Sequence, residues 1–93
     1  MATEHALKTL PQYWDAVERG EKTFEVRRDD RGFQRGDILV LHRLPEEGTN
    51  YVRGQSVPKI RRTIGWILTG GQFGIEPGYV VLSLHQEAPH GRE

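Results

Sequence analysis

A cation, a carboxylate and a guanidinium group occur within six residues of this chain, at Lys22, Glu25 and Arg27. Phe24 and Val26 alternate with them in a segment that has the composition of a short strand. Side chains of a strand alternate between its two faces, so this pattern predicts Phe24 and Val26 in a core and Glu25 and Arg27 on the opposite, polar face. Lys22 lies at the strand entrance, and its long stem can swing toward that face. The three charged groups are candidates for a cleft; the alternative is a solvated strand face with an ordinary Arg–Glu pair.

The chemistry open to Lys22 depends on its neighbours. A lysine acts as a nucleophile or base only where its surroundings favour the neutral amine. Arg27 disfavours the ammonium form through charge repulsion, whereas Glu25 stabilises it. The sequence therefore leaves both binding and catalysis open, with Lys22 and Glu25 as the catalytic residues if the protein is an enzyme.

Basic residues form two clusters along the sequence, and the second lies in a stretch from Gly48 to Ile75 without any acidic residue. The first cluster comprises Arg27, Arg28, Arg31 and Arg35, and the second comprises Arg53, Lys59, Arg61 and Arg62. If the two meet in the fold, they form a basic patch beside Tyr51 and Trp66, which is the combination used to bind single-stranded RNA. Ordinary surface charge on exposed strand positions is the alternative.

The segment Gly70–Gly74 is rich in glycine and forms the expected rim of the cleft. Backbone N–H groups at Gly70 and Gly71 can face an anion, or the loop can let a ligand approach closely. A wide connection between two strands explains the segment equally well. The four histidines show no metal-ligand spacing, so we expect neither a metal nor a cofactor.

The periodicity of apolar residues predicts one helix and five or six strands. The helix runs from Pro11 to about Arg19 and ends at Gly20, because proline suits a first turn and glycine a helix end. The strands are expected at residues 5–10, 23–27, 38–42, 51–53, 59–68 and 79–84, followed by a polar tail over 85–93. The fold class is therefore α+β, a small, mostly antiparallel barrel with one main helix. The predicted core comprises Trp14, Val17, Phe24, Val26, Ile38, Val40, Val80 and Leu82.

Size and composition indicate one small domain over residues 1–93, with an ordered core from about 5 to 84. Thirteen basic and thirteen acidic residues give no net charge, so bulk electrostatics do not argue for nucleic-acid binding. The absence of cysteine excludes disulfides and thiolate metal sites. Neither a signal peptide nor a membrane-spanning run is apparent, so we expect a soluble, cytoplasmic monomer.

The run Gly20-x-Lys22-x-x-Glu25-x-Arg27 resembles the GxKxxExR signature of the ASCH superfamily, small β-barrels related to PUA RNA-binding modules. The likeness to a compact bacterial and phage branch of unknown function extends over the chain from His5 to Leu84. It rests on His5-x-Leu7-Lys8, Pro11-x-Tyr13-Trp14-x-Ala16-Val17, Phe33-Gln34-x-Gly36-Asp37-Ile38-Leu39 and Gly74-Ile75-x-Pro77-Gly78-Tyr79-Val80-Val81-Leu82.

This resemblance implies a PUA-like barrel whose cleft binds RNA or a nucleotide. Some superfamily members are amidohydrolases that deacylate N-acylated cytidine, with a catalytic lysine that corresponds to Lys22. Glu25 stands where those enzymes have a threonine, and their further glutamate lies in an insert that this chain lacks, so that Glu76 would have to replace it. Another branch has been described as a ribonuclease.

Taken together, the sequence favours an RNA- or modified-nucleotide-binding domain. Its expected contact residues are Lys22, Glu25, Arg27, Arg53, Arg61, Arg62, Gly70 and Gly71. A small hydrolase acting on an N-acylated nucleoside or on RNA is the second hypothesis, and a regulatory module that binds another protein is the third.

Overall fold

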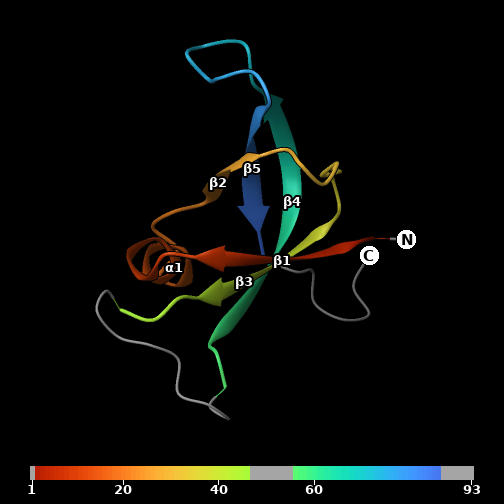
Figure 1. Ribbon diagram of the computed structural model, residues 1–93. Helices are drawn as coiled ribbons and strands as arrows, with labels where there is room; N and C mark the ends of the chain where they lie inside the picture. The colour runs from red at the N-terminus through yellow and green to blue at the C-terminus, as the bar shows by residue number, and fades with distance from the viewer. Residues whose placement is uncertain (1, 47–55, 87–93) are drawn as a thin grey trace.

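The protein folds as a five-stranded, strongly curled half-barrel with a helix at one side (Figure 1). The computed structural model describes residues 2–46 and 56–86. Its elements are β1 (Glu4–Thr9), α1 (Pro11–Glu18), β2 (Phe24–Arg28), β3 (Ile38–Arg43), β4 (Lys59–Thr69) and β5 (Tyr79–His85). The strand order is β1-β3-β4-β5-β2, in which β1 and β3 are parallel and the other pairs antiparallel. This confirms the predicted α+β class. The predicted strand at 51–53 and most of the tail at 85–93 lie outside the described residues.

Helix α1 begins at Pro11 as predicted, ends at Glu18, one residue before the predicted Arg19, and directs the chain into β2. Pro11 occupies its first turn, and Gly20, at φ 80°, takes the left-handed conformation that ends it. The backbone N–H groups of Glu21 and Lys22 then both donate to the carbonyl oxygen of Ala16. These bonds fix Lys22 beside the helix end, immediately before β2.

Several contacts attach α1 to the sheet, among them those of Trp14 and Val17. The indole Nε1 of Trp14 donates a hydrogen bond of 2.9 Å to the carbonyl oxygen of Leu41 on β3. Val17 is buried in the core. Leu10, the residue before the helix, is about half exposed.

The core lies inside the curl of the sheet. Its buried apolar residues are Leu7, Val17, Phe33, Leu39, Leu41, Ile64, Val80, Leu82 and Leu84. The predicted burial of Val17, Val80 and Leu82 is confirmed, and Trp14 is partly buried. On β3, however, the inward positions are Leu39 and Leu41, whereas Ile38 and Val40 are only partly buried. All four are apolar, so alternation alone could not set the phase of this strand.

The predicted phase of β2 is wrong. Phe24 and Val26 are 45% and 49% exposed, whereas Glu25 is only 4% exposed. The register explains the reversal, because Glu25 lies directly opposite Leu82 of β5, and paired residues point to the same side of a sheet. Leu82 is a core residue, so Glu25 also points inward, and its charge is balanced by cations rather than by water.

Side chains bridge the gap between the two edge strands, β1 and β2. Arg27 donates from Nη2 to the carbonyl oxygen of Lys8 at 3.1 Å and to Thr9 Oγ1 at 3.3 Å. Arg31, just beyond β2, donates to the carbonyl oxygen of Ala6 at 3.1 Å. Two carbonyl groups on the free edge of β1 are thus satisfied by guanidinium groups, which join the ends of the half-barrel.

The connection between β4 and β5 projects from the sheet at the top of Figure 1. It closes tightly at its base, where the backbone N–H of Gly70 donates to the carbonyl oxygen of Tyr79 at 2.7 Å. A Cβ atom at Gly70 would collide with the carbonyl oxygens of Glu76 and Tyr79, so this position requires glycine. In the part of the chain that the structure describes, no helix has the length and apolar character to cross a membrane.

Candidate functional site

A buried carboxylate lies between two cations at the centre of the predicted site. Lys22 Nζ is 2.8 Å from Glu25 Oε2, and Arg27 Nε is 3.0 Å from Glu25 Oε1. The three side chains therefore lie together, although the strand phase from which this was expected is reversed. Each carboxylate oxygen accepts one charge-assisted hydrogen bond, which is what permits a carboxylate to lie so far from water.

The ammonium of Lys22 lies beside two aromatic rings. Its Nζ is 4.8 Å from the centre of the Phe24 ring and 5.6 Å from that of Tyr13, within the range of cation–π attraction. The same Nζ donates to the carbonyl oxygen of Phe24 at 2.6 Å. A hollow of about 360 Å³ opens here, lined by Tyr13, Lys22, Phe24, Glu25 and Val26. We call it the Lys22 hollow. It offers aromatic surface, a donor and a carboxylate to one small, flat ligand.

Arg27 holds the edge strands together and does not line the Lys22 hollow. It was predicted to contact bound RNA or a nucleotide. Its Nε is instead bonded to Glu25, and its Nη2 is bonded to Lys8 and Thr9 on β1. The Arg27 guanidinium group therefore orients Glu25 and fixes the distance between β1 and β2.

The other predicted cations lie away from the Lys22 hollow. Arg61 forms an ion pair with Glu4 at 2.9 Å, which lowers the pKa of that carboxyl group. Arg62 lies on the helix side of β4, where its Nη2 is 3.4 Å from the carbonyl oxygen of Val17 at the end of α1. Arg53 lies outside the described residues. The first cluster is likewise divided, since Arg35 packs on Trp66 with its Cζ 5.1 Å from the ring centre.

The glycine-rich loop borders a neighbouring hollow rather than the Lys22 hollow. Neither Gly70 nor Gly71 lines the space around Lys22, and their predicted place at its rim is wrong. Gly74 of the same loop does line a second hollow beside Val26. Glu76 lines that second hollow as well and not the first, so it does not stand in for a catalytic glutamate beside Lys22.

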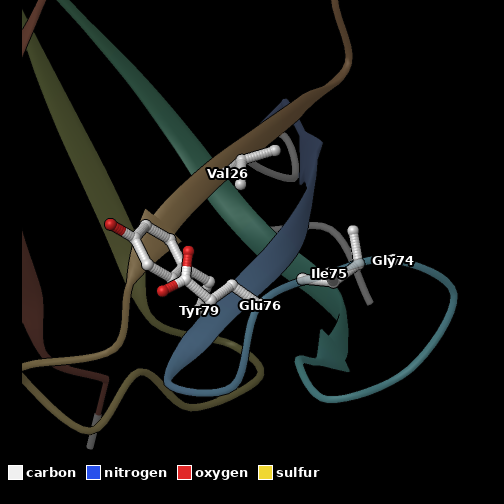
Figure 2. Close-up of a pocket in the computed structure, with 5 residues that line it drawn as sticks. All are labelled: Val26, Gly74, Ile75, Glu76 and Tyr79. Atoms are coloured by element: carbon white, nitrogen blue, oxygen red, sulfur yellow. The ribbon is translucent and has the colours of Figure 1, made fainter.

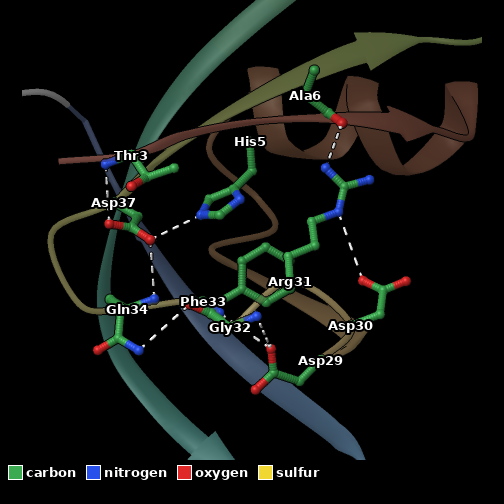
Figure 3. A network of polar contacts seen from close by, with 10 residues as sticks. All are labelled: Thr3, His5, Ala6, Asp29, Asp30, Arg31, Gly32, Phe33, Gln34 and Asp37. Atoms are coloured by element: carbon green, nitrogen blue, oxygen red, sulfur yellow. Dashed lines mark hydrogen bonds and ion pairs between the residues drawn. The ribbon is translucent and has the colours of Figure 1, made fainter.

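A buried His–Asp pair was not predicted from the sequence (Figure 3). His5 Nε2 lies 2.8 Å from Asp37 Oδ2, which also accepts from the backbone N–H of Gln34, while Oδ1 accepts from that of Thr3. Burial acts to raise the pKa of Asp37, but the bonds from His5 and the two amides lower it overall. The ring of His5 packs edge-on against Phe33 at 4.8 Å. The signal in the sequence was the alternation of residues 4–9, which places His5 on the same inward face as Leu7.

These contacts give the His5–Asp37 pair a structural role. It attaches the start of β1 to the turn before β3. The adjoining turn is held in the same way, because Asp29 Oδ1 accepts from the amides of Gly32 and Phe33 (Figure 3). Among residues 2–46 and 56–86, no three His, Asp or Glu side chains gather as a metal site.

The fold is thus a small domain built on a curled sheet. Its site contains a buried carboxylate that is paired with two cations, beside a hollow lined by two aromatic rings. The chain belongs to the family described as "Domain of unknown function (DUF3850)", whose match covers residues 4–84, from the first residue of β1 into the end of β5. It is similar to the "Uncharacterized 12.9 kDa protein in GpA 3'region" of Escherichia phage P2, with 45% identity over 42 residues. That alignment covers 45% of this chain and 38% of the phage protein.

Proposed function

We propose that the protein is an ASCH-like domain that binds a nucleobase, as part of a nucleotide or of single-stranded RNA, in the Lys22 hollow. The single observation that carries this proposal is the position of the Lys22 ammonium between Glu25 and the rings of Tyr13 and Phe24. Stacking surface combined with hydrogen-bonding groups is how proteins bind unstacked bases. The GxKxxExR signature supports the same assignment.

Each lining residue has a defined part in such binding. Tyr13 and Phe24 are about half exposed and offer ring faces or edges against which a base can pack. Glu25 has lone pairs beyond the two that Lys22 and Arg27 occupy, and these can accept from an exocyclic amine. Lys22 has a third N–H that can donate to a base carbonyl or a phosphate oxygen. A base with both an amine and a carbonyl, such as cytosine, matches this set.

Binding agrees better with the geometry of Lys22 than hydrolysis does. Its ammonium already donates to Glu25 Oε2 at 2.8 Å and to the carbonyl oxygen of Phe24 at 2.6 Å. To act as a nucleophile, the nitrogen would have to present a lone pair to the substrate, whereas here it is held as a hydrogen-bond donor to two acceptors. The amidohydrolase hypothesis is therefore the alternative, and the experiment with N4-acetylcytidine tests it.

The proposal is tested by isothermal titration calorimetry with the four ribonucleoside monophosphates. We expect at least one to bind the unmodified protein, Lys22→Ala to weaken binding at least tenfold, and Lys22→Arg to retain much of it because the cation is kept. Lys59→Ala is the matched control, since Lys59 is exposed at the start of β4. Absence of binding for all four nucleotides, or equal losses in Lys22→Ala and Lys59→Ala, would overturn the proposal.

A second measurement separates binding from catalysis. The unmodified protein is incubated with N4-acetylcytidine, and the products are separated by chromatography. We expect the compound to remain intact. Deacylation by the unmodified protein that is lost in Lys22→Arg would show instead that Lys22 is catalytic, because a guanidinium does not give up its proton in proteins.

A further inference from the structure

Three hollows follow one another along β2. The first is the Lys22 hollow. The second, of about 210 Å³, is lined by Val26, Gly74, Ile75, Glu76 and Tyr79, and Figure 2 shows these residues. The third, of about 260 Å³, is lined by Arg28, Glu76, Pro77, Gly78 and Tyr79. Val26 is shared by the first and second hollows, and Glu76 and Tyr79 by the second and third. We call this series the β2 groove.

The reversed phase of β2 creates this groove. Phe24, Val26 and Arg28 are alternate residues, so all three point outward, about 7 Å apart along the strand. The groove from Phe24 to Arg28 therefore spans roughly 14 Å. Its hollows are near or below the lower end of the ~300–1,000 Å³ typical of whole ligand pockets. Each therefore has room for one ring-sized group, and together they fit a chain of repeating units.

Both ends of the β2 groove carry a cation beside an aromatic ring. At one end, Lys22 Nζ is 4.8 Å from the ring centre of Phe24, and at the other, Arg28 Cζ is 5.6 Å from that of Tyr79. Apolar Val26 and Ile75 lie between these pairs. A cation combined with a ring at successive positions suits a chain in which flat bases alternate with phosphates.

We infer that the β2 groove binds about three consecutive nucleotides of single-stranded RNA, an inference that rests on the proposed function of the Lys22 hollow. One base occupies that hollow, and a second packs against Tyr79 while Arg28 contacts a phosphate. Glu76 lines the same two hollows as Tyr79 and can only accept hydrogen bonds when ionised, so it suits a ribose 2′-hydroxyl there, a group that DNA lacks.

An extended peptide fits this surface less well. Peptides that recognise sheets commonly add as a further strand to a free edge. The free edges here belong to β1 and β2, and the guanidinium groups of Arg27 and Arg31 already occupy the gap between them through Lys8 and Ala6. A peptide strand would have to displace both groups, whereas bases on the outer face of β2 would displace neither.

Calorimetry with uridylate and cytidylate oligomers of one to five nucleotides tests the inference. Affinity should rise up to the third nucleotide and then level off, with each added stacked base contributing about 5- to 150-fold. Arg28→Ala should weaken the trinucleotide at least fivefold, leave the mononucleotide unchanged and reduce the salt slope by about 0.7. Arg35→Ala is the matched control, because Arg35 also packs on a ring, that of Trp66, but lines none of the three hollows.

A second pair of variants tests the role of the Tyr79 ring. Tyr79→Phe keeps the stacking surface and should retain trinucleotide affinity, whereas Tyr79→Leu should lose it. Thermal unfolding of both variants identifies any general loss of structure, and an affinity loss in Tyr79→Leu counts only if its mononucleotide binding is unchanged.

The outcomes separate the two proposals. Equal affinity for mono- and trinucleotides, or equal losses in Arg28→Ala and Arg35→Ala, would overturn the β2 groove and leave the Lys22 hollow intact. No binding of any oligomer would overturn the β2 groove, and if none of the four mononucleotides bound either, the Lys22 hollow would be overturned as well. Equal affinity for the deoxyribonucleotide trimer would refute the assignment of Glu76 to the 2′-hydroxyl and the choice of RNA. Binding only of extended peptides along this face would likewise refute the RNA assignment.

Discussion

Replacing Glu25 with glutamine removes the negative charge between Lys22 and Arg27 but keeps the size of the side chain. In the folded protein, each oxygen of Glu25 accepts one bond from a cation, at 2.8 and 3.0 Å. Glutamine has one oxygen and one NH₂ group, so one cation would keep a weaker, neutral acceptor and the other would face a donor. The variant therefore tests whether the buried carboxylate stabilises the fold.

The magnitude follows from these contacts. A hydrogen bond to a charged group contributes about 1.5–3 kcal/mol, and two are weakened or lost. The side chains of Lys22 and Arg27 are 18% and 24% exposed, so water recovers part of the loss by solvating them. We expect Glu25→Gln to reduce the free energy of unfolding by about 2–3 kcal/mol. For a domain of this size, that corresponds to a decrease in Tm of roughly 8–24 °C.

Urea unfolding followed by circular dichroism measures the effect. Glu21→Gln is the matched control, because Glu21 also pairs with an arginine at 2.8 Å but its side chain is 65% exposed. The control should unfold at the same urea concentration as the unmodified protein. Equal midpoints for Glu25→Gln and Glu21→Gln would refute the stabilising role of the buried carboxylate.

Three further predictions concern the scaffold. The pKa of Asp37 lies below its ordinary value of 3.8, so its carboxylate contributes stability above about pH 4 that is lost as pH falls through the folded-state pKa. Urea midpoints of Asp37→Asn should therefore fall less on acidification than those of the unmodified protein, and parallel curves would contradict this. Gly70→Ala should cost about 1–3 kcal/mol of unfolding free energy because its Cβ meets backbone oxygens, whereas Gly65→Ala meets side-chain atoms that can move and should cost less; equal losses in chemical denaturation would be contrary to expectation. Trp14→Phe deletes the bond to Leu41 and should cost about 1 kcal/mol in the same assay, so an unchanged midpoint would show that this bond adds no stability.

The sequence was sufficient to predict the elements of the fold. Pro11 and Gly20 delimit α1 because each suits the conformation required at one end of a helix. The apolar run that begins at Ile38 and the alternation that begins at Lys59 identify β3 and β4 within a residue or two at each end. These signals are local, so each element can be predicted without knowledge of the rest of the chain.

The direction in which β2 faces could not be predicted in the same way. In an alternating strand, the apolar residues normally face the core because an unpaired charge is costly to bury. In β2 the charged residue Glu25 faces the core instead, and its charge is paired with Lys22 and Arg27. That outcome depends on the pairing of Glu25 with Leu82, which is distant in sequence. The His5–Asp37 pair was missed for the same reason, since its partners are 32 residues apart. The three charged residues could be identified from the sequence. The hollow beside them could be predicted only with knowledge of the register of β2 against β5.

The strand order has a consequence for the synthesis of the protein. β2 is made early, yet its partner in the sheet is β5, the last strand among the described residues. Pairings between strands far apart in the sequence form slowly, because closing the long intervening segment costs conformational entropy. During synthesis, Phe24 and Val26 therefore have no paired strand until Tyr79–His85 has left the ribosome. Chaperones can bind the unpaired β2 during this interval. A nascent chain that stops before Tyr79 contains every residue of the Lys22 hollow and lacks the strand on which that hollow is assembled.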